Sequence, residues 1–213
     1  LVSVSGEGSL FDASRTRLFR FYRDGAMQVC DGARAILPAD TKFGESYVGS
    51  NELTVSGEGS QLLFTNTVTV AEDGAAKTNT PLVILGYAAS ATCTVSVVDG
   101  GYFGFADGSV GLLRMGQNEN TFGKLNIDGG KVVLPDYTAD ATYIGYNSSA
   151  ELNVTAGELI VSNVVRCSAH PKPTIPYTSV IRQSGGNILF YNGITLNYGA
   201  KENFTADMYL TGG

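Results

Sequence analysis

The chain of 213 residues has no tryptophan, a single histidine and only three cysteines. So few cysteines, odd in number, cannot staple a fold, so we interpret Cys30, Cys93 and Cys167 as small buried hydrophobes. Because no run of 18 apolar residues occurs, we expect no transmembrane segment. Charged residues make up only 16% of the chain while 43% are hydrophobic, a balance that indicates a packed core and not a disordered chain.

Positive charge is also scarce. The 14 lysines and arginines are outnumbered by 20 aspartates and glutamates, which gives a net charge of −6. A chain with this balance does not attract a polyanion, so we expect no nucleic-acid partner. No motif indicates a cofactor. The chain opens on alternating residues at 1–4 without a signal peptide, so we expect a mature or excised piece of a longer protein.

Glycine, by contrast, is abundant at 27 residues, and it recurs at the turn of a repeated sequence motif. Each copy has two apolar residues two positions apart, a glycine turn, an apolar run and then Asn or Asp. The clearest copies are residues 125–136, 152–163 and 181–192. With the turn as the zero position, the copies fall at residues 7, 32, 58, 101, 130, 157, 186 and 213, in steps of 25, 26, 43, 29, 27, 29 and 27.

The pattern around each turn predicts three short strands per repeat. Alternation before the turn marks a strand with one buried face, and the apolar run after the turn marks a second strand. A third strand is predicted to end at a glycine, as in residues 47–49 and 114–116. At Gly101 the pattern slips, because Val98 fits the apolar position and Ser96 does not. No stretch shows a helical stripe, so we expect almost no helix.

Strands that return in phase every 25 to 29 residues form the coils of a solenoid. We therefore predict an all-β, right-handed parallel β-helix of about seven to eight coils, roughly 35 Å long. It forms a single domain over residues 1–213, is expected to be a segment of a longer solenoid, and carries insertions at about 67–82 and 167–177. The competing fold is an antiparallel sandwich with Asp-Gly hairpin turns, but a sandwich need not keep its strands in a fixed register.

One polar position recurs six residues after the turn. Four successive copies place Asp107, Asp136, Asn163 and Asn192 there. We interpret this position as a structural ladder at a corner, because Asn and Asp tolerate left-handed backbone, and Asn amides can bond to one another between coils. The alternative is a cation site at Asp107 and Asp136. Calcium needs six or more oxygen ligands, so we predict no metal and keep this pair as the one candidate.

Five of the basic residues gather near the N-terminus among aromatic residues. They are Arg15, Arg17, Arg20, Arg23 and Arg34, interleaved with Phe19, Phe21 and Tyr22. One interpretation is a first coil whose arginine stems cover apolar edges at the end of the solenoid. The other is a surface that binds an anionic glycan or a protein, and its members are Arg15, Arg17, Arg20, Arg23, Phe19 and Tyr22.

The repeat resembles that of the right-handed β-helices in autotransporter passenger domains and related bacterial surface adhesins. Pectate-lyase-like enzymes and phage tailspikes share this architecture. The resemblance covers nearly the whole chain but rests on pattern and composition, so it implies a fold more than an activity. It implies a non-catalytic bacterial protein, secreted or on the cell surface, that stacks its coils as a spacer and presents loops.

The resemblance also implies two alternatives, a polysaccharide-acting lyase or glycoside hydrolase and a tailspike-like glycan binder with an apolar strip along its axis. A hydrolase needs paired carboxylates, and Glu45, Glu52, Glu119 and Glu151 fall at different phases. We predict no catalytic residues, and the question of an enzyme stays open with the balance against it. The expected partners are a host or bacterial surface glycan or protein, or another solenoid segment stacked end to end.

Overall fold

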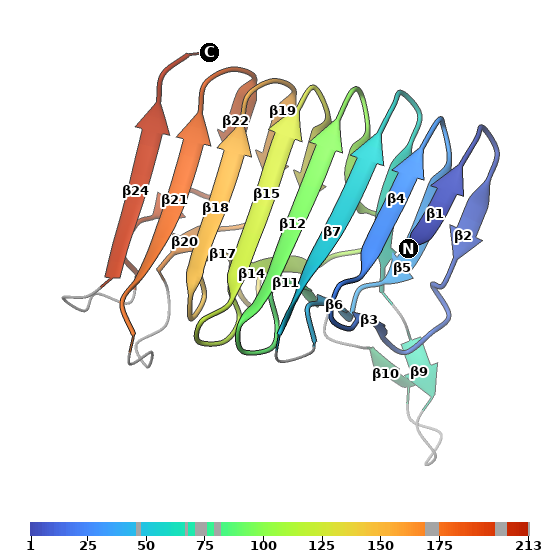
Figure 1. Cartoon of the computed structure of the whole chain (residues 1–213), viewed down its shortest axis with the longest axis horizontal. Coiled ribbons are helices and arrows are strands. Elements are labelled where there is room, and N and C mark those ends of the chain that lie inside the picture. The colour runs from blue at the N-terminus through green and yellow to red at the C-terminus, as the bar shows by residue number, and fades with distance from the viewer. Residues whose placement is uncertain are drawn as a thin grey trace.

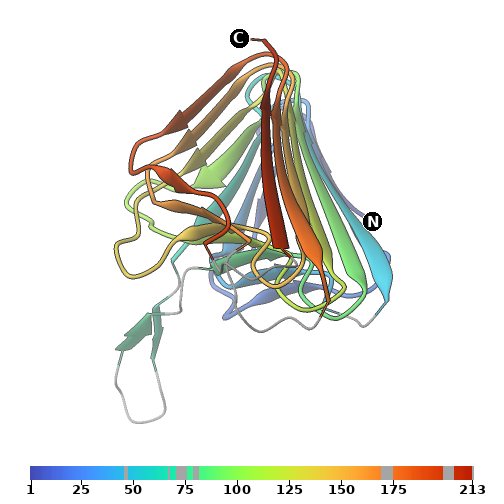
Figure 2. The ribbon, with the colours of Figure 1, turned by 90° about the vertical axis from the view of Figure 1, so that its left-hand side faces the viewer.

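The computed structural model describes residues 1–45, 48–66, 68–70, 76–78, 82–168, 175–198 and 204–212. These residues form 24 strands and no helix. Three sheets of parallel strands enclose a roughly triangular section (Figure 2). The predicted all-β parallel β-helix is confirmed. No described element is a helix long and apolar enough to cross a bilayer.

The three sheets differ mainly in strand length. Sheet 1 contains β1 (Val2–Ser5), β4 (Ala26–Cys30), β7 (Gly49–Ser56), β12 (Ala91–Val98), β15 (Phe122–Asp128), β18 (Ser149–Val154), β21 (Tyr177–Gln183) and β24 (Phe204–Leu210). Sheet 2 contains β2 (Leu10–Asp12), β5 (Arg34–Pro38), β8 (Gln61–Thr65), β13 (Tyr102–Phe105), β16 (Lys131–Leu134), β19 (Glu158–Val161) and β22 (Asn187–Phe190). Sheet 3 contains β3 (Phe19–Phe21), β6 (Thr41–Phe43), β11 (Leu82–Leu85), β14 (Leu112–Met115), β17 (Thr142–Ile144), β20 (Val165–Cys167) and β23 (Ile194–Thr195).

Each coil visits sheets 1, 2 and 3 in that order, and the next coil is displaced along the axis (Figure 1). Seen from the C-terminal end, the chain rises through sheet 1, descends through sheet 2 and crosses sheet 3 while advancing toward the viewer, so the coil is right-handed (Figure 2). The solenoid makes about six turns, slightly fewer than the seven to eight predicted. The last copy of the repeat contributes only β24.

Two details of the predicted register were wrong. In β12 the inward residues are Val95 and Val97, which pair with Leu53 and Val55 of the preceding coil, so Val98 is not the in-phase residue. The third strand of the second coil is β6 and not residues 47–49. Residues 46–47 lie outside the described residues, and Gly49 begins β7. Both errors arose because the corner lengths vary between coils.

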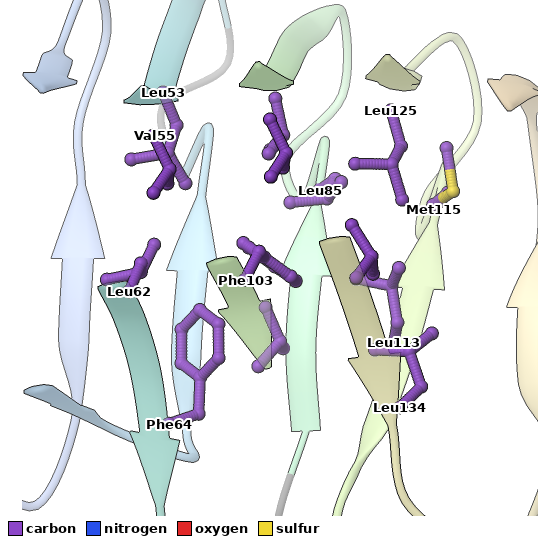
Figure 3. Close-up of a cluster of buried hydrophobic side chains, with 14 of the residues drawn as sticks. Leu53, Val55, Leu62, Phe64, Leu85, Phe103, Leu113, Met115, Leu125 and Leu134 are labelled. Atoms are coloured by element: carbon purple, nitrogen blue, oxygen red, sulfur yellow. The ribbon is translucent and has the colours of Figure 1, made fainter. Parts of the chain in front are cut away.

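Apolar side chains from all three sheets fill the interior (Figure 3). Leu53 and Val55 of sheet 1 pack with Leu62 and Phe64 of sheet 2, and Leu85 of sheet 3 completes the layer. Each of these five side chains is at most 1% exposed. Burial of roughly 25 cal/mol per Å² of apolar surface is the main force that holds successive coils together.

An aromatic stack closes the N-terminal end of this core. Phe11, Phe19, Phe21 and Phe43 follow one another with ring centroids 6.1, 5.2 and 5.0 Å apart. The stack spans β2, β3 and β6, so it covers the first coils from the inside. Edge-to-face and stacked rings at these separations add to the stability that burial provides.

The predicted insertions fall at two corners. β9 (Val68–Val70) and β10 (Ala76–Thr78) form an antiparallel hairpin that pairs with none of the three sheets and projects from the third coil (Figure 1). Residues 67, 71–75 and 79–81 of the first predicted insertion lie outside the described residues. At the second, β20 ends at Cys167 and β21 begins at Tyr177, and residues 169–174 between them are not among those described.

Candidate functional site

The outer face of sheet 3 carries a row of charged and aromatic residues. In these short strands the residue between two inward-facing ones points outward. Strand pairing aligns the outward residues from coil to coil as Arg20, Lys42, Ile84, Arg114, Tyr143, Arg166 and Thr195. Four of the seven are cations, so this row gathers positive charge on one face of an acidic chain.

The first two cations of the row are held by neighbours. Arg20 Nε lies 2.7 Å from Glu45 Oε2. Lys42 Nζ lies 4.7 Å from the centre of the Tyr87 ring, within the range of a cation–π interaction. Lys42 Nζ is also 3.9 Å from Asp40 Oδ1. These contacts leave the N-terminal part of the row electrically balanced.

Asp140 is the centre of a bonded network farther along the row. Its Oδ2 lies 2.6 Å from Arg114 Nη2, and its Oδ1 accepts hydrogen bonds from Tyr143 OH at 2.6 Å and from the Ala141 N–H at 2.9 Å. Burial of the carboxyl opposes ionisation, but these three donors outweigh it and lower the pKa of Asp140 below its ordinary value. Asp140 is therefore a fixed anion that neutralises Arg114.

Tyr143 connects this network to Arg166. Burial, and then the hydrogen bond to Asp140, raise the pKa of Tyr143 to about 12. The hydroxyl of Tyr143 thus stays protonated, donates to Asp140 and accepts a hydrogen bond of 3.1 Å from Arg166 Nη1. The Arg166 guanidinium also lies 4.2 Å from the Tyr198 ring centre and 6.0 Å from that of Tyr143. Arg166 is held by one directed hydrogen bond and by contact with two rings.

The connections between sheets 2 and 3 shorten abruptly beside Arg166. The corner after β16 has seven residues, 135–141, whereas the corners after β19 and β22 have three each, 162–164 and 191–193. The strands on both sides of these corners stay in register from coil to coil. The extra residues of the long corner therefore project beyond its shorter neighbours. The solenoid therefore has a step at this edge, on the left in Figure 2.

A groove of about 310 Å³ lies at this step, and we call it the step groove. One wall of the groove is formed by Asp136 and residues 138–141 of the long corner. The rest of the groove is lined by Asn163, Val164, Arg166 and Asn192. Charged and amide groups thus converge from three successive coils. Small-molecule sites of ~300–1,000 Å³ are typical of proteins, so the step groove suits one small ligand or one unit of a polymer.

The structure places three of the four predicted ladder residues in the step groove. Asn163 is buried, donates from Nδ2 to the Asp140 carbonyl at 2.8 Å, and accepts a hydrogen bond of 2.7 Å from the Val164 N–H. Asn192 Nδ2 donates to the Ser162 carbonyl of the preceding coil at 2.6 Å. The amides therefore bond to main chain rather than to one another, and they tie one coil to the next.

The two aspartates of the ladder lie in different depressions. Asp136 is exposed in the step groove, while Asp107 is exposed in a second depression of about 410 Å³ beside Arg34 and Tyr102. No group of three or more His, Cys, Asp or Glu side chains that could hold a metal ion occurs in the described part of the chain.

The predicted arginine-rich surface is divided by the fold. Phe19 faces the core, and Arg20 points outward from the same strand. Arg15 and Arg17 are exposed in the connection before β3, and the exposed Tyr22 and Arg23 follow β3. The six residues are thus spread over the core, one sheet face and two corners of the first coil, although Arg20 Nη1 still reaches Tyr22 OH, to which it donates at 3.5 Å.

Sheet 1 carries a second outer row, which is polar along most of its length and ends in an arginine and a tyrosine. It runs Ser3, Gln28, Thr54, Ser96, Asn126, Asn153, Arg182 and Tyr209. Asn153 Nδ2 donates to Asn126 Oδ1 at 2.9 Å, which is the amide-to-amide contact that the ladder hypothesis expected at the corner. One amide-to-amide contact between coils therefore occurs on the sheet face, between residues outside the predicted ladder.

Comparisons with known proteins give no family to which the chain can be assigned. No family model, no curated protein and no solved structure matches the chain. Function must therefore be argued from the molecule itself.

The Arg114–Asp140–Tyr143–Arg166 network was missed by sequence reasoning, although a signal for it exists. Arg114, Tyr143 and Arg166 each lie two residues before the position at which the third strand turns, in three successive coils. Reading the residue types at that single phase would have revealed the row. Asp140 would still have been missed, because it lies in a corner whose length is not repeated in the neighbouring coils.

Proposed function

We propose that this chain is a non-catalytic β-solenoid that is secreted or displayed on a cell surface, where it serves as a spacer and presents loops at its corners. Its type would be that of passenger domains and adhesins. The observation that supports this most directly is that charged side chains pair between successive coils. Lys131 Nζ lies 2.7 Å from Glu158 Oε2, and Lys124 Nζ lies 3.1 Å from Glu151 Oε2.

These pairs join residues that occupy the same position in neighbouring coils. Lys131 pairs in register with Glu158 on sheet 2, and Lys124 with Glu151 on sheet 1. Arg182 Nη1, one coil farther, lies 3.3 Å from Glu151 Oε1. Exposed pairs contribute only about 0–1 kcal/mol each, but opposite charges set directly across parallel strands disfavour any shift of register. The carboxylates of these sheet faces serve stacking.

The alternative of a polysaccharide-acting enzyme is favoured by the step groove, where Asp136 and Asp140 accompany Arg166. Asp140, however, has a lowered pKa and three hydrogen-bond donors. A general acid needs a raised pKa, and the lowered pKa and the ion pair with Arg114 make Asp140 a weak base, so Asp140 suits neither role. Asp136 alone does not make the carboxylate pair of a glycoside hydrolase.

The alternative of a tailspike-like assembly is favoured by an apolar row on the outer face of sheet 2. Ile36, Leu63, Gly104, Val133, Ile160 and Leu189 pair in register along the axis. Such a row is the strip that lateral association of solenoids would need. If this alternative holds, sedimentation gives a trimeric mass that Ile160→Glu reduces to a monomer, whereas the spacer hypothesis expects Ile160→Glu to leave the mass unchanged.

The spacer hypothesis is tested by incubating the chain with polyuronides and neutral polysaccharides and measuring reducing ends and the ultraviolet absorbance of unsaturated products. We expect no release above that of heat-unfolded protein. Activity that disappears in Asp136→Asn, with thermal unfolding unchanged, would overturn the non-catalytic proposal and establish the groove as an active site.

A further inference from the structure

We infer that the step groove binds a carboxylate-bearing sugar unit, a uronic acid, whose carboxylate is held by Arg166 and whose hydroxyls bond to Asp136 and the amides of Asn163 and Asn192. This inference goes beyond the spacer function, which would stand if the groove bound nothing.

Arg166 is prepared for a planar anion. Among the described residues, one of its five N–H groups is taken, by Tyr143 OH at 3.1 Å. The guanidinium lies 4.2 Å from the centre of the Tyr198 ring and 6.0 Å from that of Tyr143, and these contacts restrict its movement. A guanidinium fixed in this way loses little freedom when it binds, and its fork matches the two oxygens of a carboxylate.

The charge of Arg166 is not cancelled inside the network. Asp140 lies closest to Arg114, with 2.6 Å between the charged atoms, and no described carboxylate lies within 4.0 Å of Arg166. Other cations of the solenoid have a carboxylate partner. Arg20 on sheet 3 lies 2.7 Å from Glu45, and Lys131 on sheet 2 lies 2.7 Å from Glu158. Of the cations in the row, Arg166 is the one that lines the step groove, so it can pair with a ligand carboxylate there.

The rest of the groove selects for hydroxyl groups as well. Asp136 is an exposed carboxylate at the rim, which repels a bare anion but accepts hydrogen bonds from hydroxyls. The amides of Asn163 and Asn192 are anchored by their Nδ2 groups to carbonyls of the preceding coil, so their position is fixed. A ligand that matches both Arg166 and this group of hydroxyl-binding residues carries one carboxylate and several hydroxyls. A uronic acid has this chemistry, and its size suits a groove of about 310 Å³.

The test is an NMR titration of the full chain with three probes: glucuronate, glucose and acetate. We expect glucuronate to shift signals of residues 136–141, 163–166 and 192, with glucose and acetate each binding at least about tenfold more weakly. Arg166→Gln should abolish the glucuronate shifts, and Arg166→Lys should retain part of the affinity because the charge remains. Arg182→Gln is the charge-matched control, since Arg182 also lies over an aromatic ring but is on sheet 1, where it pairs with Glu151.

Three results would overturn the inference. Glucose binding as tightly as glucuronate would remove the role of Arg166, and acetate binding as tightly would remove the role of the sugar. An equal loss in Arg182→Gln and Arg166→Gln, with both variants showing wild-type thermal unfolding, would show that binding depends on overall charge. Binding without cleavage of a polyuronide leaves the non-catalytic proposal intact, and cleavage overturns that proposal alone.

Discussion

At the scale of single residues, Gly157 shows how closely the coils approach at the corner between sheets 1 and 2. Its φ is +84°, and a Cβ placed there would lie 2.1 Å from the Gly130 carbonyl oxygen of the preceding coil. Gly108 also has a positive φ, +73°, but nothing lies within 4 Å of the corresponding Cβ position. The two glycines share a backbone constraint and differ in their surroundings.

Replacing each of these two glycines by alanine should therefore separate the cost of a left-handed backbone conformation from the cost of a clash between stacked coils. We expect Gly108→Ala to lower the free energy of unfolding by about 1–2 kcal/mol, the cost of a left-handed residue with a side chain. Gly157→Ala should lower it by about 3 kcal/mol or more, because it adds a clash with backbone. Denaturant unfolding of both variants measures the difference, and equal losses would contradict the close approach of the coils.

The residues of the predicted corner ladder should contribute unequally to the stability of the fold. Asn163→Ala should cost about 2 kcal/mol, because it removes a buried side chain and leaves a part-buried carbonyl and a part-buried N–H without partners. Asn192→Ala removes one exposed hydrogen bond and should cost under about 1 kcal/mol. Asp136→Ala, at an exposed position, should change stability by less than about 0.5 kcal/mol. Equal effects at all three positions, measured by denaturant unfolding, would contradict this structure.

The three free cysteines should differ in reactivity. Cys93 and Cys167 are buried, and burial raises the pKa of both thiols, that of Cys167 to about 12. Cys30 is half-buried. At about pH 8 we expect a disulfide reagent to modify Cys30 in the native protein and the other two only after unfolding. Cys30→Ser should remove the native-state reaction, and fast labelling that persists in this variant would contradict the burial of the others.

At the scale of elements, the Asp140 network should make sheet 3 sensitive to acid. Because the pKa of Asp140 is lowered in the folded chain, its ionisation stabilises the fold above the unfolded-state pKa of about 4. This contribution is lost as the pH falls through the lowered folded-state pKa. Asp140→Asn should therefore be less stable than wild type by about 1–3 kcal/mol at neutral pH.

The difference between Asp140→Asn and wild type should begin to shrink as the pH falls below about 4, where the unfolded chain takes up a proton, and should level off only below the lowered folded-state pKa of Asp140. Unfolding curves at several pH values measure it. Asp136→Asn, a change at an exposed carboxylate of the same corner, is the control. A stability difference for Asp140→Asn that stays constant down to the acid limit would show that ionisation of Asp140 does not stabilise the fold.

Much of sheet 1 could be predicted from the sequence, because apolar residues two apart precede each turn in nearly every copy. Sheet 3 was harder, since β6 and β20 have only three residues and no alternation can be read from so few. The step groove could not be predicted at all. It depends on a corner of seven residues beside corners of three, and neither length follows from a rule that the repeat obeys.

At the scale of the whole molecule, the period of the repeat determines the fold. The candidate site lies where the repeat is interrupted. The repeat predicted stacked coils, and strand pairing from Val29 through Val55 and Val97 to Ile127 confirms them. The arginine-rich stretch was chosen for its local density, yet the fold divides it. Arg166, from a different coil, meets Tyr143 and Asp140 only because coils stack in register, so proximity in sequence was a poor guide to proximity in space.

In-register stacking is the claim on which the row, the groove and the proposals all depend, and spin-label distances test it directly. Labels at Gln28 paired in turn with Asn126, Asn153 and Arg182, in a Cys30→Ser background, share one outer row of sheet 1 at three, four and five coil steps. We expect distances near ~14, ~19 and ~24 Å, rising by ~4.8 Å per coil. Distances that do not rise with coil number would contradict the solenoid.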